Sequence, residues 1–176
     1  QNYVYAIRGG NDTALLTGSN ENDRLTSKRS YSTLKRQDGA YFNYAAGFDQ
    51  VTVDVSSGGG IDLAFLYDEV TADAFEASPS QATLDYDHIG SPGIDTTAIG
   101  FGQVYAYAEE GGNDSAILIG SANPDKYYGL ATYSYFKAAD DSYFNYVRGF
   151  DSVIARASGP GDLAFLYDSD GDDQLG

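Results

Sequence analysis

The sequence contains no cysteine, no methionine and no tryptophan, and it has a single histidine. Without cysteine the chain can form no disulfide and offers no thiolate chemistry, and one histidine supplies too few ligands for a zinc site. No apolar run approaches the roughly 18 residues that a membrane-spanning helix needs. No signal peptide is visible and the first residue is not methionine, so we expect a processed or excised piece of a longer protein.

Positive charge is also scarce, because ten lysines and arginines stand against 26 acidic residues, for a net charge of -16. Binding to phosphate backbones or anionic lipid needs a basic stripe, so we expect neither nucleic acid nor membrane as a partner. The acidic balance favours neutral ligands, cations or simple solubility. The 176 residues fit one domain, and a hydrophobic content of 42% is enough for a folded core.

Internal repeats organise the chain. YFNYAAGFD at 41–49 matches YFNYVRGFD at 143–151, and DLAFLYD occurs at both 62–68 and 162–168. These matches give a period near 100 residues, but a frame led by aspartate recurs at half that spacing, at Asp12, Asp62, Asp114 and Asp162. A second aspartate follows each of these by 11 residues, at Asp23, Asp73, Asp125 and Asp173. Repeats of this length indicate a solenoid or a propeller.

The repeat divides a single domain, 1–176, into a partial unit and four further pieces: 1–8, 9–57, 58–110, 111–158 and a truncated 159–176. Short alternating runs bounded by Gly, Asn, Asp and Ser predict strands throughout, with no helical spacing. We therefore predict an all-β, right-handed parallel β-helix of about seven turns, each unit of about fifty residues making two turns. A β-propeller is the chief rival, but three and a half blades cannot close a ring.

In the aspartate-led strand, one face carries small and large residues that we assign to the interior: Ala14/Leu16, Ala64/Leu66, Ala116/Leu118 and Ala164/Leu166. The opposite face is also apolar, with Leu15, Phe65, Ile117 and Phe165. Such a face is either covered or is an exposed patch with a purpose.

The repeated aspartates have two interpretations. In the first, each side chain accepts turn amides and ends the preceding strand. In the second, calcium sits between turns and relieves the repulsion of stacked carboxylates. The strongest candidate for a calcium site alternates oxygen ligands around a glycine turn: Asp168, Asp170, Asp172 and Asp173. No cofactor is otherwise required.

Outward tyrosines form the main candidate binding surface. If Leu34 points inward, Tyr31, Thr33 and Lys35 point outward, and the matching positions are Gln81, Thr83 and Asp85, then Tyr133, Tyr135 and Lys137. If Phe42 and Phe144 point inward, Tyr41, Asn43, Tyr143 and Asn145 form a similar column, and Tyr127 and Tyr128 add aromatic surface. Rings that stack on sugars beside groups that bond hydroxyls would suit a polysaccharide, although tyrosines can also form ladders that only stabilise the sheet. The predicted carbohydrate-binding residues are Tyr31, Lys35, Tyr127, Tyr128, Tyr133, Tyr135, Lys137, Tyr143 and Asn145.

Evidence for catalysis is poor, so we expect no enzyme. His88, the single histidine, lies in a polar loop, and no Ser-His-Asp set can be argued. No carboxylate pair stands out for glycoside hydrolysis. Lyases on β-helices use basic residues near carboxylates, and the only basic cluster is Arg24, Lys28, Arg29, Lys35 and Arg36 in the first full unit.

The motifs GGNDSAILIGS, YFNYVRGFDSV and DLAFLYDS resemble a class of β-helical carbohydrate-binding modules of bacterial plant-polysaccharide hydrolases, associated with xylan. They are also similar to tandem repeats of large bacterial surface proteins. The first resemblance implies a non-catalytic module that binds a polysaccharide, with xylan the leading ligand, outside a bacterial cell and covalently linked to a catalytic domain. The second implies a calcium-stiffened structural or adhesive repeat.

Overall fold

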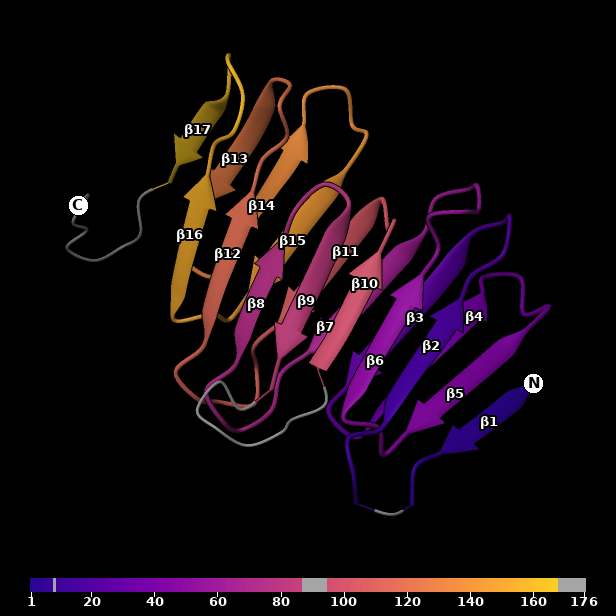
Figure 1. Cartoon of the computed structure of the whole chain (residues 1–176). Coiled ribbons are helices and arrows are strands. Elements are labelled where there is room, and N and C mark those ends of the chain that lie inside the picture. The colour runs from indigo at the N-terminus through magenta and orange to yellow at the C-terminus, as the bar shows by residue number, and fades with distance from the viewer. Residues whose placement is uncertain (8, 87–94, 168–176) are drawn as a thin grey trace.

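The computed structural model describes residues 1–7, 9–86 and 95–167, and these residues form strands and turns but no helix. The strands build a 10-stranded sheet (sheet A) and a 7-stranded sheet (sheet B) that lie face to face (Figure 1). Within the described ranges there is accordingly no helix long and apolar enough to cross a membrane.

The spatial order of the strands differs from their order in the chain. Sheet A contains β1 (Asn2–Tyr5), β5 (Phe42–Ala46), β4 (Tyr31–Arg36), β3 (Asp23–Lys28), β7 (Leu63–Tyr67), β11 (Gln103–Tyr107), β15 (Phe144–Arg148), β14 (Tyr133–Ala138), β13 (Asp125–Gly129) and β17 (Leu163–Leu166). Sheet B contains β16 (Ser152–Arg156), β12 (Ser115–Ile119), β8 (Ala74–Ala77), β9 (Gln81–Asp85), β10 (Asp95–Ile99), β6 (Gln50–Asp54) and β2 (Thr13–Thr17).

Each repeat of the chain forms five strands. Three of them make an antiparallel meander within one sheet, the fourth crosses to the other sheet, and the fifth returns. Strands from successive passes then pair in parallel, as β3 does with β7 and β7 with β11. The predicted all-β solenoid with parallel stacking is therefore confirmed. The predicted seven turns are not confirmed, because each meander, which the sequence analysis did not foresee, keeps three strands in one sheet.

Successive meanders lie in alternate sheets: β3–β5 in sheet A, β8–β10 in sheet B and β13–β15 in sheet A. A meander in one sheet is thus followed by a meander in the other sheet, and the meander returns to the same sheet only after two repeats. The alternation explains why the long match between 41–49 and 143–151 skips the middle repeat, since both segments lead into sheet A.

The core lies between the sheets and is filled by the inward residues of every strand. Leu34 and the pair Ala64 and Leu66 are fully buried, as the sequence predicted, and so are Ala116 and Leu118. Ala164 and Leu166 share the inward register position of Tyr127 and Gly129 but are exposed, because β17 is the last strand of sheet A. Small and large side chains therefore interdigitate across both sheets in the same pattern.

A Gly-Phe pair forms the corner before each lone crossing strand. Gly47, Gly100 and Gly149 all have positive φ angles, of 75°, 81° and 85°. A Cβ on Gly149 would lie 1.9 Å from the carbonyl oxygen of Ala108, so no other residue fits without moving the backbone. The phenylalanines that follow fill the core near the corner.

Three of the repeated aspartates form hydrogen-bonded corners, as in the first of the two interpretations, but each accepts the amide of a residue on a neighbouring pass of the chain, outside its own turn. The carboxylate oxygens of Asp62, Asp114 and Asp162 accept the backbone amides of Asp23, Asp73 and Asp125 at 2.6, 2.8 and 2.9 Å. The side chain of Asp23 in turn accepts the amide of Ser19 at 2.6 Å. Burial raises the pKa of both Asp62 and Asp114. These carboxylates are therefore part of the backbone hydrogen-bond network that joins successive passes of the chain.

Candidate functional site

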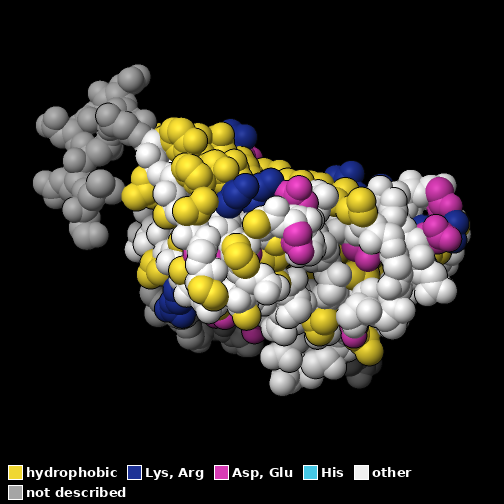
Figure 2. All heavy atoms as spheres, turned by 90° about the horizontal axis from the view of Figure 1, so that it is seen from above, with side chains coloured by type: hydrophobic (Ala, Val, Ile, Leu, Met, Phe, Trp, Pro, Cys, Tyr) yellow, Lys and Arg dark blue, Asp and Glu magenta, His cyan; other side chains and the backbone are white. Residues whose placement is uncertain are grey.

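The outer faces of the two sheets differ in their aromatic content. Strand alternation directs the following rings outward from sheet A: Tyr3, Tyr5, Tyr31, Phe42, Tyr44, Phe65, Tyr67, Tyr105, Tyr107, Tyr128, Tyr133, Tyr135, Phe144, Tyr146, Phe165 and Tyr167. No strand of sheet B directs an aromatic ring outward. Viewed from above, hydrophobic side chains with lysine and arginine among them gather along the upper edge of the molecule (Figure 2).

Equivalent positions of the repeat show that the fold does not require these rings. The central outward residue of the fifth strand is Phe65 in sheet A but Ile117 in sheet B. The central outward residue of the fourth strand is Tyr105 in sheet A but Thr52 in sheet B. Tyr133, at the start of the middle meander strand in sheet A, corresponds to Gln81 in sheet B. Aromatic content therefore follows the face and not the repeat position.

The register of sheet A aligns the outward residues in rows along the solenoid axis. The middle row reads, from β1 to β17, Tyr3, Tyr44, Thr33, Thr26, Phe65, Tyr105, Tyr146, Tyr135, Tyr128 and Phe165. Most neighbouring rings of this row are in contact, with centroids 5.1 Å apart for Phe65 and Tyr105 and 4.5 Å apart for Tyr128 and Tyr135. We call this outer surface of sheet A the aromatic face.

Basic side chains lie within the aromatic face. Its outward cations, more than half of the ten in the chain, are Arg24, Lys28, Lys35, Lys126, Lys137 and Arg148. The guanidinium of Arg24 lies 4.3 Å over the ring of Phe65, and the ammonium of Lys28 lies 5.1 Å from the ring centroid of Tyr67. These contacts are within the range of a cation–π interaction.

A hollow of about 520 Å³ opens in the aromatic face where β11, β14 and β15 meet. It is lined by Gln103, Tyr105, Tyr135, Lys137, Asp141, Tyr143 and Phe144. The hydroxyl of Tyr105 donates to Oε1 of Gln103 at 2.9 Å, and the ammonium of Lys137 contacts the carboxylate of Asp141 at 2.7 Å. The hollow therefore combines aromatic rings with a cation, a carboxylate and an amide that can form hydrogen bonds.

Asp141 holds an unusual backbone conformation beside this hollow. Its φ is 60°, whereas the equivalent position of the first repeat is Gly39 with a φ of 82°. A residue with a Cβ is uncommon in this region, and aspartate is among those that tolerate it best. The third repeat therefore accepts a strained residue where the first has glycine, and gains a carboxylate at the hollow.

Six of the nine predicted binding residues lie on the aromatic face: Tyr31, Lys35, Tyr128, Tyr133, Tyr135 and Lys137. Thr33 also points outward, as expected, but Gln81, Thr83 and Asp85 lie on sheet B rather than in the same column. The structure thus brings the meander tyrosines of the first and third repeats to one surface and places the meander of the middle repeat, β8–β10, in the other sheet.

The outward orientation predicted for Tyr127, Tyr143 and Asn145 is wrong. Tyr127 packs inside against Phe136 with centroids 5.7 Å apart, and its hydroxyl donates to Ser134. Tyr143 and Asn145 are 3% and 1% exposed. The amide of Asn145 donates to the carbonyl of Ser78, and burial together with the nearby Asp125 carboxylate raises the pKa of Tyr143.

Tyr41 and Asn43, the first-repeat counterparts, were assigned to the same outward column. The structure instead places Asn43 opposite Leu34 on the inward side of β5, while Phe42 and Phe144 point outward. Two adjacent aromatics do not indicate by pattern alone which one faces the core.

Sequence reasoning also missed part of the aromatic face, namely Tyr105, Tyr107, Phe144 and Tyr146. The signal that could have found them is the difference between repeats. At most outward positions, as for Tyr3 and Tyr105 or Tyr44 and Tyr146, the residues that are spaced by about 100 are aromatic together, while those in between are not.

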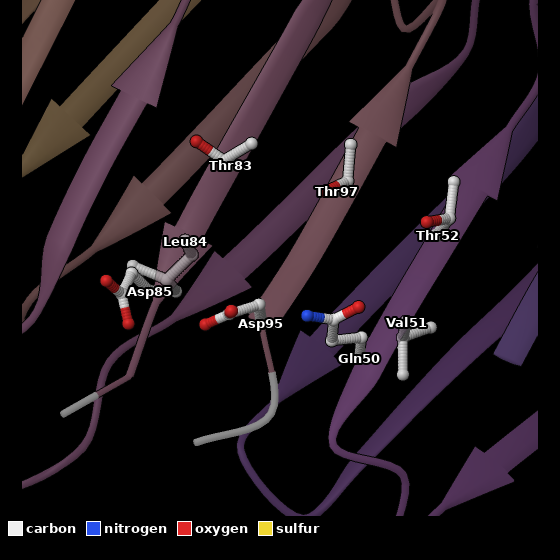
Figure 3. Close-up of a pocket in the computed structure, with 8 residues that line it drawn as sticks. All are labelled: Gln50, Val51, Thr52, Thr83, Leu84, Asp85, Asp95 and Thr97. Atoms are coloured by element: carbon white, nitrogen blue, oxygen red, sulfur yellow. The ribbon is translucent and has the colours of Figure 1, made fainter. Parts of the chain in front are cut away.

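The outer face of sheet B has polar and acidic side chains where sheet A has many of its rings, as the close-up in Figure 3 shows for one hollow. A hollow of about 250 Å³ is lined by threonines, Gln50 and the facing carboxylates of Asp85 and Asp95. Burial and the neighbouring Asp85 raise the pKa of Asp95 from 3.8 to about 6. This surface offers polar and acidic groups but no ring for stacking.

The predicted calcium ligands Asp168, Asp170, Asp172 and Asp173 lie outside the described residues, as does His88. Among the residues that are described, no group of three or more carboxylates or imidazoles is arranged to hold a metal ion. No observation on the described part of the chain favours a metal centre over the corner role of the aspartates.

Three comparisons with known proteins add no relative. No family model, no curated protein and no solved structure matches this chain.

Proposed function

We propose that this chain is a non-catalytic binding module that holds an extended polysaccharide on the aromatic face of sheet A. One observation carries the proposal: equivalent positions of the same repeat are aromatic in sheet A and aliphatic or polar in sheet B. Rings exposed on one side only, in contact with polar groups, form the type of surface on which sugar rings stack.

A purely structural role for the rings is less consistent with this difference. Cross-strand aromatic pairs stabilise a sheet by about 0.2–1 kcal/mol each, and sheet B would benefit from them as much as sheet A. Sheet B instead has threonine, serine and isoleucine at those positions and still packs the same core. The rings of sheet A therefore have a use that is specific to their surface.

The geometry suits a long, unbranched ligand. The middle row of rings runs along the solenoid axis across the sheet, and the strands that carry it are fixed by the paired backbone. A preformed surface of this kind loses little conformational freedom on binding. The resemblance to β-helical carbohydrate-binding modules makes xylan the first polymer to test, and it implies a module outside a bacterial cell that is linked to a catalytic domain.

Native affinity electrophoresis in gels containing xylan, mixed-linkage glucan, mannan or pectin tests the proposal. We expect retardation in at least one gel, and its loss in Tyr133→Ala and in Tyr135→Ala, because each removes a ring of the face. The matched controls are Gln81→Ala and Thr83→Ala, which change the equivalent positions of sheet B and should migrate as the wild type does. No retardation in any gel, or unchanged retardation in both tyrosine variants, would refute the proposal.

A further inference from the structure

We propose that the polysaccharide bound by the aromatic face is acidic and carries carboxylates along its length, as a uronic-acid polymer does. This inference rests on the proposed function and adds the chemical class of the ligand. It starts from the distribution of charge. In a chain with a net charge of -16, no strand of sheet A directs an acidic side chain outward, although six cations lie there.

The outer face of sheet B has the reverse distribution of charge. Its strands direct Asp54, Glu76, Asp85 and Asp95 outward, and their only outward cation is Arg156. Lys35 and Lys137, at the end of the middle meander strand in sheet A, correspond to Asp85 in sheet B. The sign of the charge thus follows the face, as the aromatic content does.

Two pairs of like charges are adjacent on the aromatic face. Arg24 of β3 lies directly opposite Lys35 of β4, and Lys126 of β13 lies directly opposite Lys137 of β14. Like charges at directly opposite positions destabilise a sheet. Both pairs occupy the same positions of the first and third repeats, so the sheet is destabilised by like charges at two places. An anion bound between the members of a pair would remove this destabilisation.

The two pairs belong to one row. Between them the row contains Leu63, Gln103 and Phe144, and the pairs are five strands apart. With about 4.8 Å between strands, the pairs lie about 24 Å from each other. A polymer stacked on the neighbouring row of rings would pass both pairs, which a small anion could not do.

Two of the cations already have a carboxylate partner at the rim of the face. Lys137 contacts Asp141, and Nε of Arg148 lies 3.6 Å from Oε1 of Glu109. Arg24 differs, because its guanidinium lies over Phe65 and its buried Nε has no hydrogen-bond partner. A guanidinium packed on a ring retains a planar fork of donors for a carboxylate, and such charge-assisted bonds are stronger than neutral ones.

The acidity of the whole chain does not prevent this binding at physiological salt. The two sheets of a solenoid pack about 10 Å apart, and outward side chains add to that separation. The Debye length at 0.15 M ionic strength is about 8 Å, so the carboxylates of sheet B are largely screened from a ligand on sheet A. The positive charge of the aromatic face therefore determines whether an acidic polymer binds there.

The test compares polygalacturonate with its fully methyl-esterified form, and acidic xylan with carboxyl-reduced xylan, by affinity electrophoresis and calorimetry. Each pair shares a backbone and differs in charge. We expect the acidic member to bind more tightly, with affinity falling as salt rises. The double variant Lys126→Gln/Lys137→Gln should bind the acidic polymer about tenfold more weakly. Arg156→Gln, which removes the cation of sheet B, is the matched control and should bind as the wild type does. Asp141→Asn, which frees Lys137, should bind about threefold more tightly.

Other outcomes would overturn the inference in distinct ways. Equal binding of acidic and neutralised polymers, with both lost in Tyr135→Ala, would leave the proposed function standing and reject the acidic ligand. Binding to none of the polymers would reject both. Sedimentation that shows wild-type self-association, abolished in Lys126→Gln/Lys137→Gln, would assign the cations to contact with the acidic sheet B of a second copy and would also reject the inference.

Discussion

The outer faces of sheet A and sheet B are made from the same five-strand repeat, and they share neither aromatic content nor charge. Positions such as Phe65 and Ile117, or Lys137 and Asp85, are equivalent in the repeat and lie on opposite sides of the solenoid. The inward positions of the two sheets do not differ in this way, since in both most are small or large apolar residues. The fold therefore determines the residues that point inward, and the outward residues are free to follow function.

The corner aspartates occur in the repeats of both sheets, and we expect their substitution to have the largest effect on the free energy of unfolding. Asp23→Ala in the first repeat and Asp73→Ala in the second each remove a fully buried carboxylate that accepts a backbone amide. We expect each to lower the free energy of unfolding by about 2–3 kcal/mol, because a buried donor loses a charged acceptor. Urea unfolding measures this. A loss in one repeat without a loss in the other would show that the two sides are not built alike.

The carboxylates of sheet B should give that face a pH dependence that the aromatic face lacks. The pKa of Asp95 is raised from 3.8 to about 6 by burial and by Asp85. A raised pKa means that the folded state binds the proton more tightly, so the stability from this group is present below about pH 4 and is lost as the pH rises through about 6. Asp95→Asn should therefore raise the melting temperature at pH 7.5 and change it little at pH 4. A larger gain at pH 4 than at pH 7.5 would contradict the assignment.

The strained turn of the third repeat should give the smallest effect on stability. Asp141→Gly places at this turn the residue that the first repeat has at Gly39. We expect a gain of about 1 kcal/mol in the free energy of unfolding, because glycine adopts a positive φ without steric cost. Urea unfolding with Asp140→Gly as a neighbouring control would measure it. A loss of stability would mean that the Lys137–Asp141 contact outweighs the strain.

Much of the fold follows from the sequence, because alternation and repetition are local signals. The strands, the inward position of Leu34 and a role of Asp62 and Asp114 as acceptors of backbone amides could all be predicted. The alternation of meanders between sheets could not, since an antiparallel hairpin within one sheet and a crossing to the other begin with similar polar turns. The result was a column that mixed Gln81 and Thr83 of sheet B with the tyrosines of sheet A.

Only part of the candidate site could be predicted, because the sequence does not always show which side of a strand faces the core. A strand pattern indicates which residues share a face, and it indicates which face is buried only where one side is clearly polar. Tyr143, Phe144 and Asn145 give no such contrast, and their orientation depends on the space near Asp125 and on the carbonyl of Ser78. Where the contrast exists, as for Leu34 between Thr33 and Lys35, the orientation was correct.

An exchange of outward residues between the two sheets tests the central claim most directly. One variant, Tyr133→Gln/Tyr135→Thr, gives β14 of sheet A the outward residues of β9, and the other, Gln81→Tyr/Thr83→Tyr, gives β9 of sheet B the tyrosines of β14. Affinity electrophoresis on the polysaccharide that retards the wild type should show retardation lost in the first variant and kept in the second, with both folded by circular dichroism. Full retardation of the first variant would contradict the assignment of binding to the aromatic face.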